Sequence, residues 1–382
     1  MGASGTAFGV AVGGLVALAV GLGVGRFVYT PILPFMTTEL GLTPAEGGLV
    51  ASANFLGHLL GAVAAVWARM PGSRRAWLLG SLALSAATTG AMGFTTAMAG
   101  FVALRFAGGV ASALAIVLST ALVLERLAVY GRPGLSWMPY AGVGVGIALS
   151  AVLVAGLAAH GADWSTLWLG SGVLSLLGLL ACAYLIDATP ESESASVPPG
   201  KTAARRGLPA LALAYGLFGF GYVITATFLS QLVRTTPEVA ALEAVVWLTV
   251  GVAAVPSVAF WLWLDRRYGN CTAFAAACLV ESLGVGASAF ETSTWAVLFA
   301  AVGLGGTVMG IVALGLITAR RMSGGDARRI AAVMTASFGL GQMIGPAYAG
   351  YAYGIADSFR IPTLTAAAAL LVAAVLTARL RS

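Results

Sequence analysis

The chain has 382 residues, of which 59% are hydrophobic and 9% are charged, with a formal net charge of +6 and a mean hydropathy of +0.94. Soluble domains average about 25% charged residues, so this composition excludes a water-soluble protein and predicts many membrane spans. The three cysteines show neither a metal-ligand spacing nor a disulfide framework, so we expect no metal and no cofactor.

The first predicted span contains a single charged residue, Arg26. A charge at the centre of a span costs at least roughly 2.5–3.5 kcal/mol, so a residue retained there is commonly functional. We interpret Arg26 as part of a ligand site; the alternative is a structural arginine bound to backbone carbonyls or water. Tyr29 and Thr30 follow at i+3 and i+4, near the same face. Pro31 and Pro34 are expected to bend or end this span.

Polar residues inside later spans give further candidates. His58 follows Asn54 by four residues on the second span, Arg105 lies on the fourth, and Gln342 lies on the eleventh. Glu281 is the one carboxylate deep in a span, the ninth. His58 can carry a proton at physiological pH or act as a neutral hydrogen-bond partner. Glu281 can serve proton coupling; the alternatives are pairing with a neighbouring polar group, or a protonated carboxyl. Arg105, His58 and Glu281 are therefore the candidates for proton coupling.

Twelve apolar segments are predicted as helices, because an open sheet cannot satisfy its backbone hydrogen bonds in lipid. They cover residues 7–36, 45–68, 76–95, 98–124, 135–158, 164–186, 208–233, 240–264, 271–290, 293–319, 328–353 and 361–379.

The basic residues outside the spans fall almost entirely on one side of the predicted membrane. By the positive-inside rule that side is cytoplasmic, and both termini lie on it. The basic loops thus explain the net charge as a topology signal, and nucleic-acid binding is not expected. Only Arg234 and Arg360 fall on the other side. The cytoplasmic set is Arg69, Arg74, Arg75, Arg126, Arg132, Lys201, Arg205, Arg206, Arg266, Arg267, Arg320, Arg321, Arg328, Arg329, Arg379 and Arg381.

A polar stretch rich in Pro, Ser and Glu separates the sixth span from the seventh. We predict an N-terminal six-helix bundle at 1–188, a cytoplasmic linker at 189–206 and a C-terminal six-helix bundle at 207–382. Two six-span repeats with a site at their interface are typical of secondary transporters.

Glycine pairs recur in chain order at nearly one offset between the halves, which indicates a duplication. At these offsets Arg26 corresponds to Tyr222 and Arg105 to Val302, so the second half lacks both charges. The pairs are Gly23 and Gly25 with Gly219 and Gly221 (219 − 23 = 196), Gly108 and Gly109 with Gly305 and Gly306 (305 − 108 = 197), and Gly142 and Gly144 with Gly339 and Gly341 (339 − 142 = 197).

With this topology, the sequence resembles the major facilitator superfamily. Asp265, Arg266 and Arg267, followed by Tyr-Gly, are similar to the superfamily's loop motif between spans eight and nine. The first-half copy keeps basic residues, including Arg74 and Arg75, but lacks the aspartate. The resemblance implies a gating role for this loop motif.

Further segments narrow the resemblance. Residues 105–112 are similar to the span-four motif, whose arginine is associated with proton coupling, and residues 142–146 to the glycine-rich span-five motif without its antiporter-associated proline. Residues 25–34 and 339–346 resemble the bacterial YbfB/YjiJ-like branch. The resemblance implies an inner-membrane carrier, not an enzyme, whose central cavity is lined by spans one, four, seven and ten.

The expected cavity has no carboxylate on any of its four lining spans. Guanidinium groups bind carboxylate or phosphate through paired hydrogen bonds. We therefore expect a secondary transporter that carries a small organic anion. We expect the protein to be a monomer in contact with lipid, and its transport can be coupled to protons or independent of them. The alternative is proton-coupled efflux of drugs or other amphipathic compounds. The predicted substrate-binding residues are Arg26, Tyr29, Thr30, Arg105, Tyr215, Tyr222, Thr225 and Gln342.

Overall fold

The computed structural model describes residues 6–67, 72–186, 207–290, 293–322 and 327–380. Nearly all of these residues are helical, and no strand occurs among them. Eleven helical segments in these ranges are long and apolar enough to cross a membrane, and α12, which matches the predicted eleventh span, adds a twelfth long helix. The predicted all-helical membrane fold with two six-helix bundles is confirmed.

The first bundle contains six membrane-crossing segments, of which the first is interrupted. Its elements are α1 (Ala7–Leu18), the π-helix η2 (Ala19–Val24), α2 (Tyr29–Leu40), α3 (Pro44–Trp67), α4 (Arg74–Ala91), η3 (Met92–Phe94), α5 (Met98–Val129), η4 (Pro133–Leu135), α6 (Met138–Ala159) and α7 (Trp164–Leu185).

The second bundle repeats this order. Its elements are α8 (Leu208–Thr235), η5 (Ala240–Leu242), α9 (Glu243–Tyr268), α10 (Asn270–Phe290), α11 (Thr294–Met322), α12 (Ala327–Ala356) and α13 (Arg360–Ala378). The predicted linker at 189–206 lies outside the described residues.

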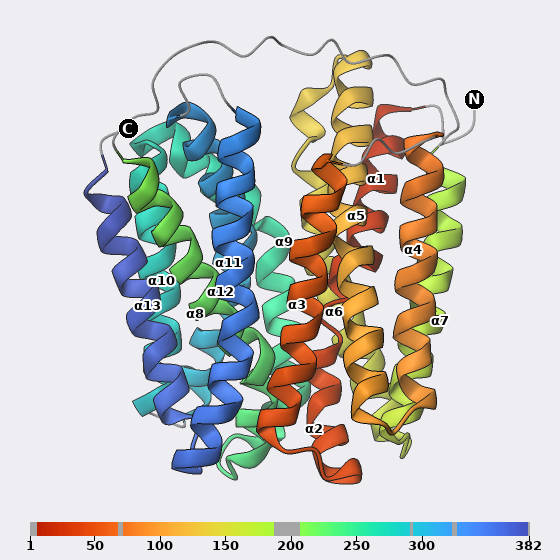
Figure 1. Ribbon diagram of the computed structural model, residues 1–382, viewed down its shortest axis with the longest axis vertical. Coiled ribbons are helices and arrows are strands. Elements are labelled where there is room, and N and C mark those ends of the chain that lie inside the picture. The colour runs from red at the N-terminus through yellow and green to blue at the C-terminus, as the bar shows by residue number, and fades with distance from the viewer. Residues whose placement is uncertain (1–5, 68–71, 187–206, 291–292, 323–326, 381–382) are drawn as a thin grey trace.

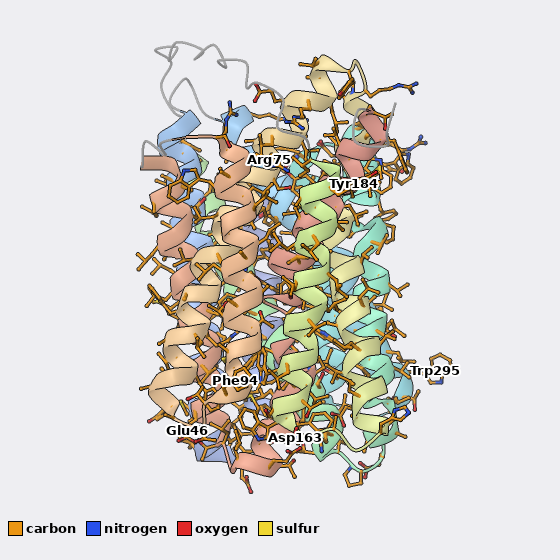
Figure 2. The ribbon with its side chains drawn as sticks, turned by 90° about the vertical axis from the view of Figure 1, so that its right-hand side faces the viewer. Glu46, Arg75, Phe94, Asp163, Tyr184 and Trp295 are labelled. Atoms are coloured by element: carbon orange, nitrogen blue, oxygen red, sulfur yellow. The ribbon has the colours of Figure 1, made fainter. Side chains whose placement is uncertain are left out.

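The bundles stand side by side, with both chain ends at the same end of the molecule (Figure 1). We call this end the terminal face and the other end the opposite face. Arg75 lies near the terminal face, whereas Glu46 and Asp163 lie near the opposite face (Figure 2). This distribution agrees with the basic side predicted from the sequence.

Side-chain caps fix where several helices begin. Thr6, Ser73 and Asp163 each accept a hydrogen bond from the backbone amide three residues further on, at 3.0, 3.1 and 2.8 Å. Such caps satisfy amides that have no partner inside the helix. Hydrogen bonds from the Thr166 side chain and from its backbone amide hold the pKa of Asp163 below its usual value.

The two bundles meet along α3 with α12, α6 with α9, and α2 with α8. Glycines allow close backbone approach at two of these contacts. A Cβ at Gly48 would lie 2.3 Å from the carbonyl oxygen of Pro346, and one at Gly144 would lie 2.7 Å from that of Gly251. These distances are too short for any side chain, so glycine is required for the halves to pack this closely.

Matching backbone contacts fix the register of the repeat for spans four and ten. A Cβ at Gly109 would lie 2.0 Å from the carbonyl oxygen of Asn54, and one at Gly305 would lie 2.1 Å from that of Val250. The two glycines are 196 residues apart in the chain, and so are the two carbonyl residues that they approach (305 − 109 = 196; 250 − 54 = 196).

The predicted offset of 197 for spans four and ten is therefore wrong by one residue. Arg105 corresponds to buried Ala301, whereas Val302 is 48% exposed and faces away from the core. The sequence alone cannot reveal this alignment error of one residue, because each glycine of one pair can be aligned with either glycine of the other pair.

Between its end at the terminal face and its midpoint, the first span contains one residue more than the seventh span does. Near the terminal face, a Cβ at Gly142 would lie 2.0 Å from the Leu15 carbonyl oxygen, and Ser337 likewise donates to the Ala212 carbonyl. Leu15 thus corresponds to Ala212 (212 − 15 = 197), and Gly142 to Ser337 rather than to Gly339.

Within η2 the offset falls by one. Cβ atoms at Gly23 and Gly219 would approach the carbonyl oxygens of Val143 and Phe338, at 2.8 and 2.6 Å, so these glycines correspond (219 − 23 = 196). The change of register thus falls inside the π-helix η2, and a π-turn accommodates one inserted residue. This register supports the predicted match of Arg26 with Tyr222.

Candidate functional site

Arg26 lies where the first membrane span is broken. The π-helix η2 ends at Val24, residues 25–28 form turns, and α2 begins at Tyr29. The amide of Gly25 still bonds to the Val20 carbonyl at 2.9 Å, a π-type spacing. The break thus comes before the prolines that were predicted to cause it. Pro31 lies in the first turn of α2 and Pro34 inside it, where neither can donate a backbone hydrogen bond.

Arg105 on α5 binds the carbonyl groups exposed by this break. Its Nη1 donates to the carbonyl of Gly25 at 3.1 Å, and its Nη2 donates to that of Arg26 at 3.0 Å. Its guanidinium also lies 4.9 Å from the centre of the Tyr29 ring. Asn54 on α3 binds the Arg105 carbonyl at 2.9 Å. Arg105 therefore holds the first span, and the structure does not support its predicted role as a direct ligand group.

Arg26 differs from Arg105 in that two neighbouring nitrogens of its guanidinium lack a partner among the described residues, whereas Arg105 leaves only its Nε without one. The residue is 5% exposed, and its guanidinium carbon lies 4.3 Å from the Phe55 ring centre and 5.4 Å from that of Phe27. Its Nε and Nη2 atoms are buried and have no hydrogen-bond partner among the described residues. These two nitrogens form one edge of the planar group, the edge that can hold both oxygens of a carboxylate.

Polar groups of the second half lie beside Arg26. Tyr222 on α8 interacts electrostatically with it. The Gln342 side-chain amide on α12 donates to the Tyr222 hydroxyl. The Gln342 Oε1 and Thr225 Oγ1 atoms are buried without a partner in the described part of the chain. Arg26, Tyr222 and Gln342 are thus linked across the two halves, and Thr225 follows Tyr222 by about one turn of α8; we call these four residues the Arg26 cluster.

Stacked aromatic rings hold Tyr222 of the Arg26 cluster in place. The Tyr222 ring lies 5.8 Å from that of Phe338 at an interplanar angle of 10°, and 5.2 Å from that of Phe218. Stacked rings fix the ring plane of Tyr222 and hence the position of its hydroxyl.

Three predicted ligand hydroxyls are bound to backbone carbonyls instead. Tyr29 donates to Gly47 at 2.8 Å, Thr30 donates to Ala226, and Tyr215 donates to Val312 at 3.2 Å. Each bond joins two different helices. Tyr29, Thr30 and Tyr215 therefore act in helix packing, and the predicted ligand role of their hydroxyls is not supported by this geometry.

The two other coupling candidates occupy different places. His58 Nδ1 lies 2.8 Å from Ser112 Oγ, and His58 interacts electrostatically with Arg26. Glu281 is fully buried; its Oε2 accepts a hydrogen bond of 2.9 Å from Thr307, and its Oε1 has no partner among the described residues. His58 thus interacts with Arg26, whereas Glu281 interacts electrostatically with Tyr222.

The loop motif at the terminal face forms an ion pair that the sequence did not reveal. Asp265 pairs with Arg321 through two bonds of 3.0 and 3.2 Å. Arg266 and Arg267 are exposed, and Arg267 lies 5.9 Å from the Tyr268 ring centre.

The first half has an ion pair at the same face, but only one of its members corresponds to the pair of the second half. Arg74 pairs with Glu125 at 2.9 Å, and Glu125 corresponds to Arg321 (321 − 125 = 196). Arg74 begins α4 and therefore matches the start of α10, whereas Asp265 lies in the preceding helix, α9. Arg75 instead bonds to the carbonyls of Ala183 and Ile186 at the end of α7.

The sequence reasoning missed Phe55, which lies under the Arg26 guanidinium, and Trp247, whose ring lies 6.5 Å from Phe27. Phe55 follows Asn54 and precedes His58, so its place on the same helix surface was a usable signal. Trp247 had none, because it comes from the other half of the chain.

Comparison with known proteins agrees with this architecture. Residues 18–378 match the family model described as "Uncharacterised MFS-type transporter YbfB". No curated protein matches the sequence significantly. A crystal structure of a mutant of the nucleoside transporter NupG has a TM-score of 0.76 at 14% identity, covering 97% of this chain and 98% of that one. The human organic anion transporter MFSD10 (TETRAN) has a TM-score of 0.67 at 17% identity, covering 97% and 99%.

Because the family model spans nearly the whole chain, the protein belongs to this family of MFS-type transporters. The two solved structures share its fold at low identity. Their names give two different substrates, so the shared fold does not select one.

Proposed function

We propose that this transporter carries a small organic anion with a carboxylate group across the bacterial inner membrane by alternating access. The observation that carries the proposal is the unused Nε and Nη2 edge of Arg26. A buried guanidinium without a partner is costly, and a carboxylate that binds both nitrogens offsets that cost. None of the ion pairs among the described residues involves Arg26.

The surroundings of Arg26 favour an anion with an apolar body. Phe55 and Phe27 cover the guanidinium with aromatic rings, while Gln342 Oε1 and Thr225 Oγ1 offer hydrogen-bond acceptors from the other half. Ligand sites commonly combine apolar walls with a few convergent polar groups. A monocarboxylate with a hydrogen-bond donor beside the acid group fits this arrangement.

The position of the Arg26 cluster favours alternating access. The guanidinium belongs to the first half, and Tyr222, Thr225 and Gln342 belong to the second. Arg26 is buried between them, so a ligand reaches it only when the halves separate on one side. In a carrier built of two repeats, such rocking exposes a site at the interface to each side in turn.

The Arg26 cluster includes no carboxylate, which counts against a lipophilic cation as the substrate. Glu281 is a buried acid that interacts electrostatically with Tyr222, and we assign it the proton of a coupled cycle. An anion would then balance the charge of Arg26, and a proton would balance that of Glu281. The basic loops of the terminal face favour a cytoplasmic location for both chain ends.

The test is uptake of radiolabelled benzoate, a small aromatic monocarboxylate, into proteoliposomes, with tetraphenylphosphonium as the cationic comparison. We expect benzoate to be carried and Arg26→Gln to reduce its uptake about 100-fold, since removing one partner of a buried charge pair costs about 2–5 kcal/mol. Arg132→Gln, an exposed arginine at the terminal face, serves as the control.

Transport of tetraphenylphosphonium without transport of benzoate would favour the alternative, efflux of amphipathic compounds. Arg26→Gln with normal uptake of the carried anion would refute the proposed site.

A further inference from the structure

A cavity of about 290 Å³ lies between the two halves, closer to the opposite face than Arg26 is. Its walls come from α2 and α6 of the first half and from η5 and α9 of the second. Alanine side chains supply most of the lining, together with Pro31 and Phe35. The helices are close-packed through glycines nearer the membrane centre, and the small alanines leave this space open further out.

One wall of this cavity contains an unsatisfied hydrogen-bond donor. Trp247 lines the cavity and is 1% exposed, and its Nε1–H has no partner among the described residues. An indole nitrogen can only donate, so whatever satisfies it brings an acceptor. A buried donor left without a partner costs free energy, which makes such a group a marker for a ligand or a water.

A positive charge borders the same cavity. Glu243 lines it and lies 3.5 Å from Arg234, whose guanidinium carbon lies 4.2 Å from the ring centre of Phe35. Arg234 belongs to the second half and Phe35 to the first, so this contact also joins the halves. The 3.5 Å separation is long for a charge-assisted hydrogen bond, which leaves Arg234 able to accept a second anion.

A contact between two aromatic rings links the cavity wall to the residue next to Arg26. The Trp247 ring lies 6.5 Å from that of Phe27, and Phe27 is the residue after Arg26. The indole therefore faces the cavity on one side and the neighbour of Arg26 on the other. A change in the Phe27–Trp247 contact would therefore alter both the cavity wall and the surroundings of Arg26.

We propose that this cavity is a second binding station for the same carboxylate, on the path between the Arg26 cluster and the opposite face. The Trp247 Nε1–H would donate to one carboxylate oxygen, Arg234 would move from Glu243 toward the ligand, and the alanine wall would hold its apolar body. This inference rests on the proposed function for the identity of the ligand.

The test is protection of an introduced thiol by benzoate. Ala155 lines the cavity, and the native cysteines are buried. In nanodiscs, where both faces are accessible, Ala155→Cys is labelled with an anionic methanethiosulfonate. We expect benzoate to slow labelling at least about fivefold, the worth of about one hydrogen bond. Protection should persist with Arg26→Gln and disappear with Trp247→Phe, which removes the donor and keeps an aromatic ring.

The matched control is His160→Cys, at the exposed end of the same helix and outside the cavity lining, which benzoate should not protect. Benzoate uptake without protection of Ala155→Cys would overturn the station and leave the proposed function standing, as would protection that is lost with Arg26→Gln. Failure to label Ala155→Cys at all would also overturn it, because a station on the path must be reachable. Protection without Arg26-dependent uptake would instead count against the proposed function.

Discussion

The Arg105 guanidinium donates a hydrogen bond of 3.0 Å to the main-chain carbonyl of Arg26, from a helix 79 residues away in sequence. A second bond of 3.1 Å reaches the carbonyl of Gly25. The two membrane arginines are thus not equivalent. Arg105 stabilises the break in the first span, and that break places the Arg26 side chain against Phe55 with one edge free.

Arg105→Lys tests this division of roles. Lysine keeps the charge but is a point donor and cannot reproduce the two-pronged bond to adjacent carbonyls. Hydrogen bonds to charged groups contribute about 1.5–3 kcal/mol, so we expect a lower melting temperature and a benzoate KM raised about tenfold. Thermal unfolding in detergent and uptake kinetics measure both. A fully active lysine variant would show that only the charge of Arg105 matters.

Tyr222→Phe and Tyr215→Phe form a matched pair on α8. The Tyr222 hydroxyl accepts the Gln342 amide beside Arg26, whereas the Tyr215 hydroxyl binds a carbonyl of α11. Each substitution costs about 1–3 kcal/mol of stability, because it leaves a buried group unpaired. Only Tyr222→Phe should also raise the KM for the anion, by about fivefold or more. Equal KM values for the two variants would place Tyr222 outside the site.

Glu281→Gln separates coupling from transport. Glutamine keeps the hydrogen bond to Thr307 but cannot release a proton. We expect uptake driven by a proton gradient to be lost, while exchange of labelled against unlabelled benzoate continues. Glu125→Gln, which affects only the ion pair with Arg74 at the terminal face, should retain the driven uptake. Accumulation by Glu281→Gln at the normal level would assign the proton elsewhere.

Gly305→Ala and Gly306→Ala test the register of the repeat. A Cβ at Gly305 would lie 2.1 Å from the Val250 carbonyl oxygen, so this variant should unfold or express poorly. A Cβ at Gly306 meets nothing within 4 Å, and alanine there should be neutral or stabilising by about 0.5–1 kcal/mol, since glycine disfavours helix. Expression level and thermal unfolding compare the two. Equal effects would contradict the contact between α9 and α11.

The membrane fold follows from the sequence because hydropathy is a local property. Apolar runs of about 20 residues must be helical in lipid, whatever packs against them. The basic loops, the duplication and the presence of a charged Arg26 inside the first span could therefore be predicted. The match of Arg26 with Tyr222 also held, because the π-helix that shifts the register ends before it.

Tertiary structure decided which polar side chains are free. Tyr29, Thr30, Tyr215 and Arg105 carry the same chemical groups as the residues of the Arg26 cluster, but carbonyls of other helices already bind them. Those carbonyls lie between 18 and 196 residues away along the chain. A hydrogen-bond partner of that kind leaves no periodic pattern in the sequence. The sequence thus determined which segments cross the membrane, and only the packing of the helices determined which guanidinium edge is left without a partner among the described residues.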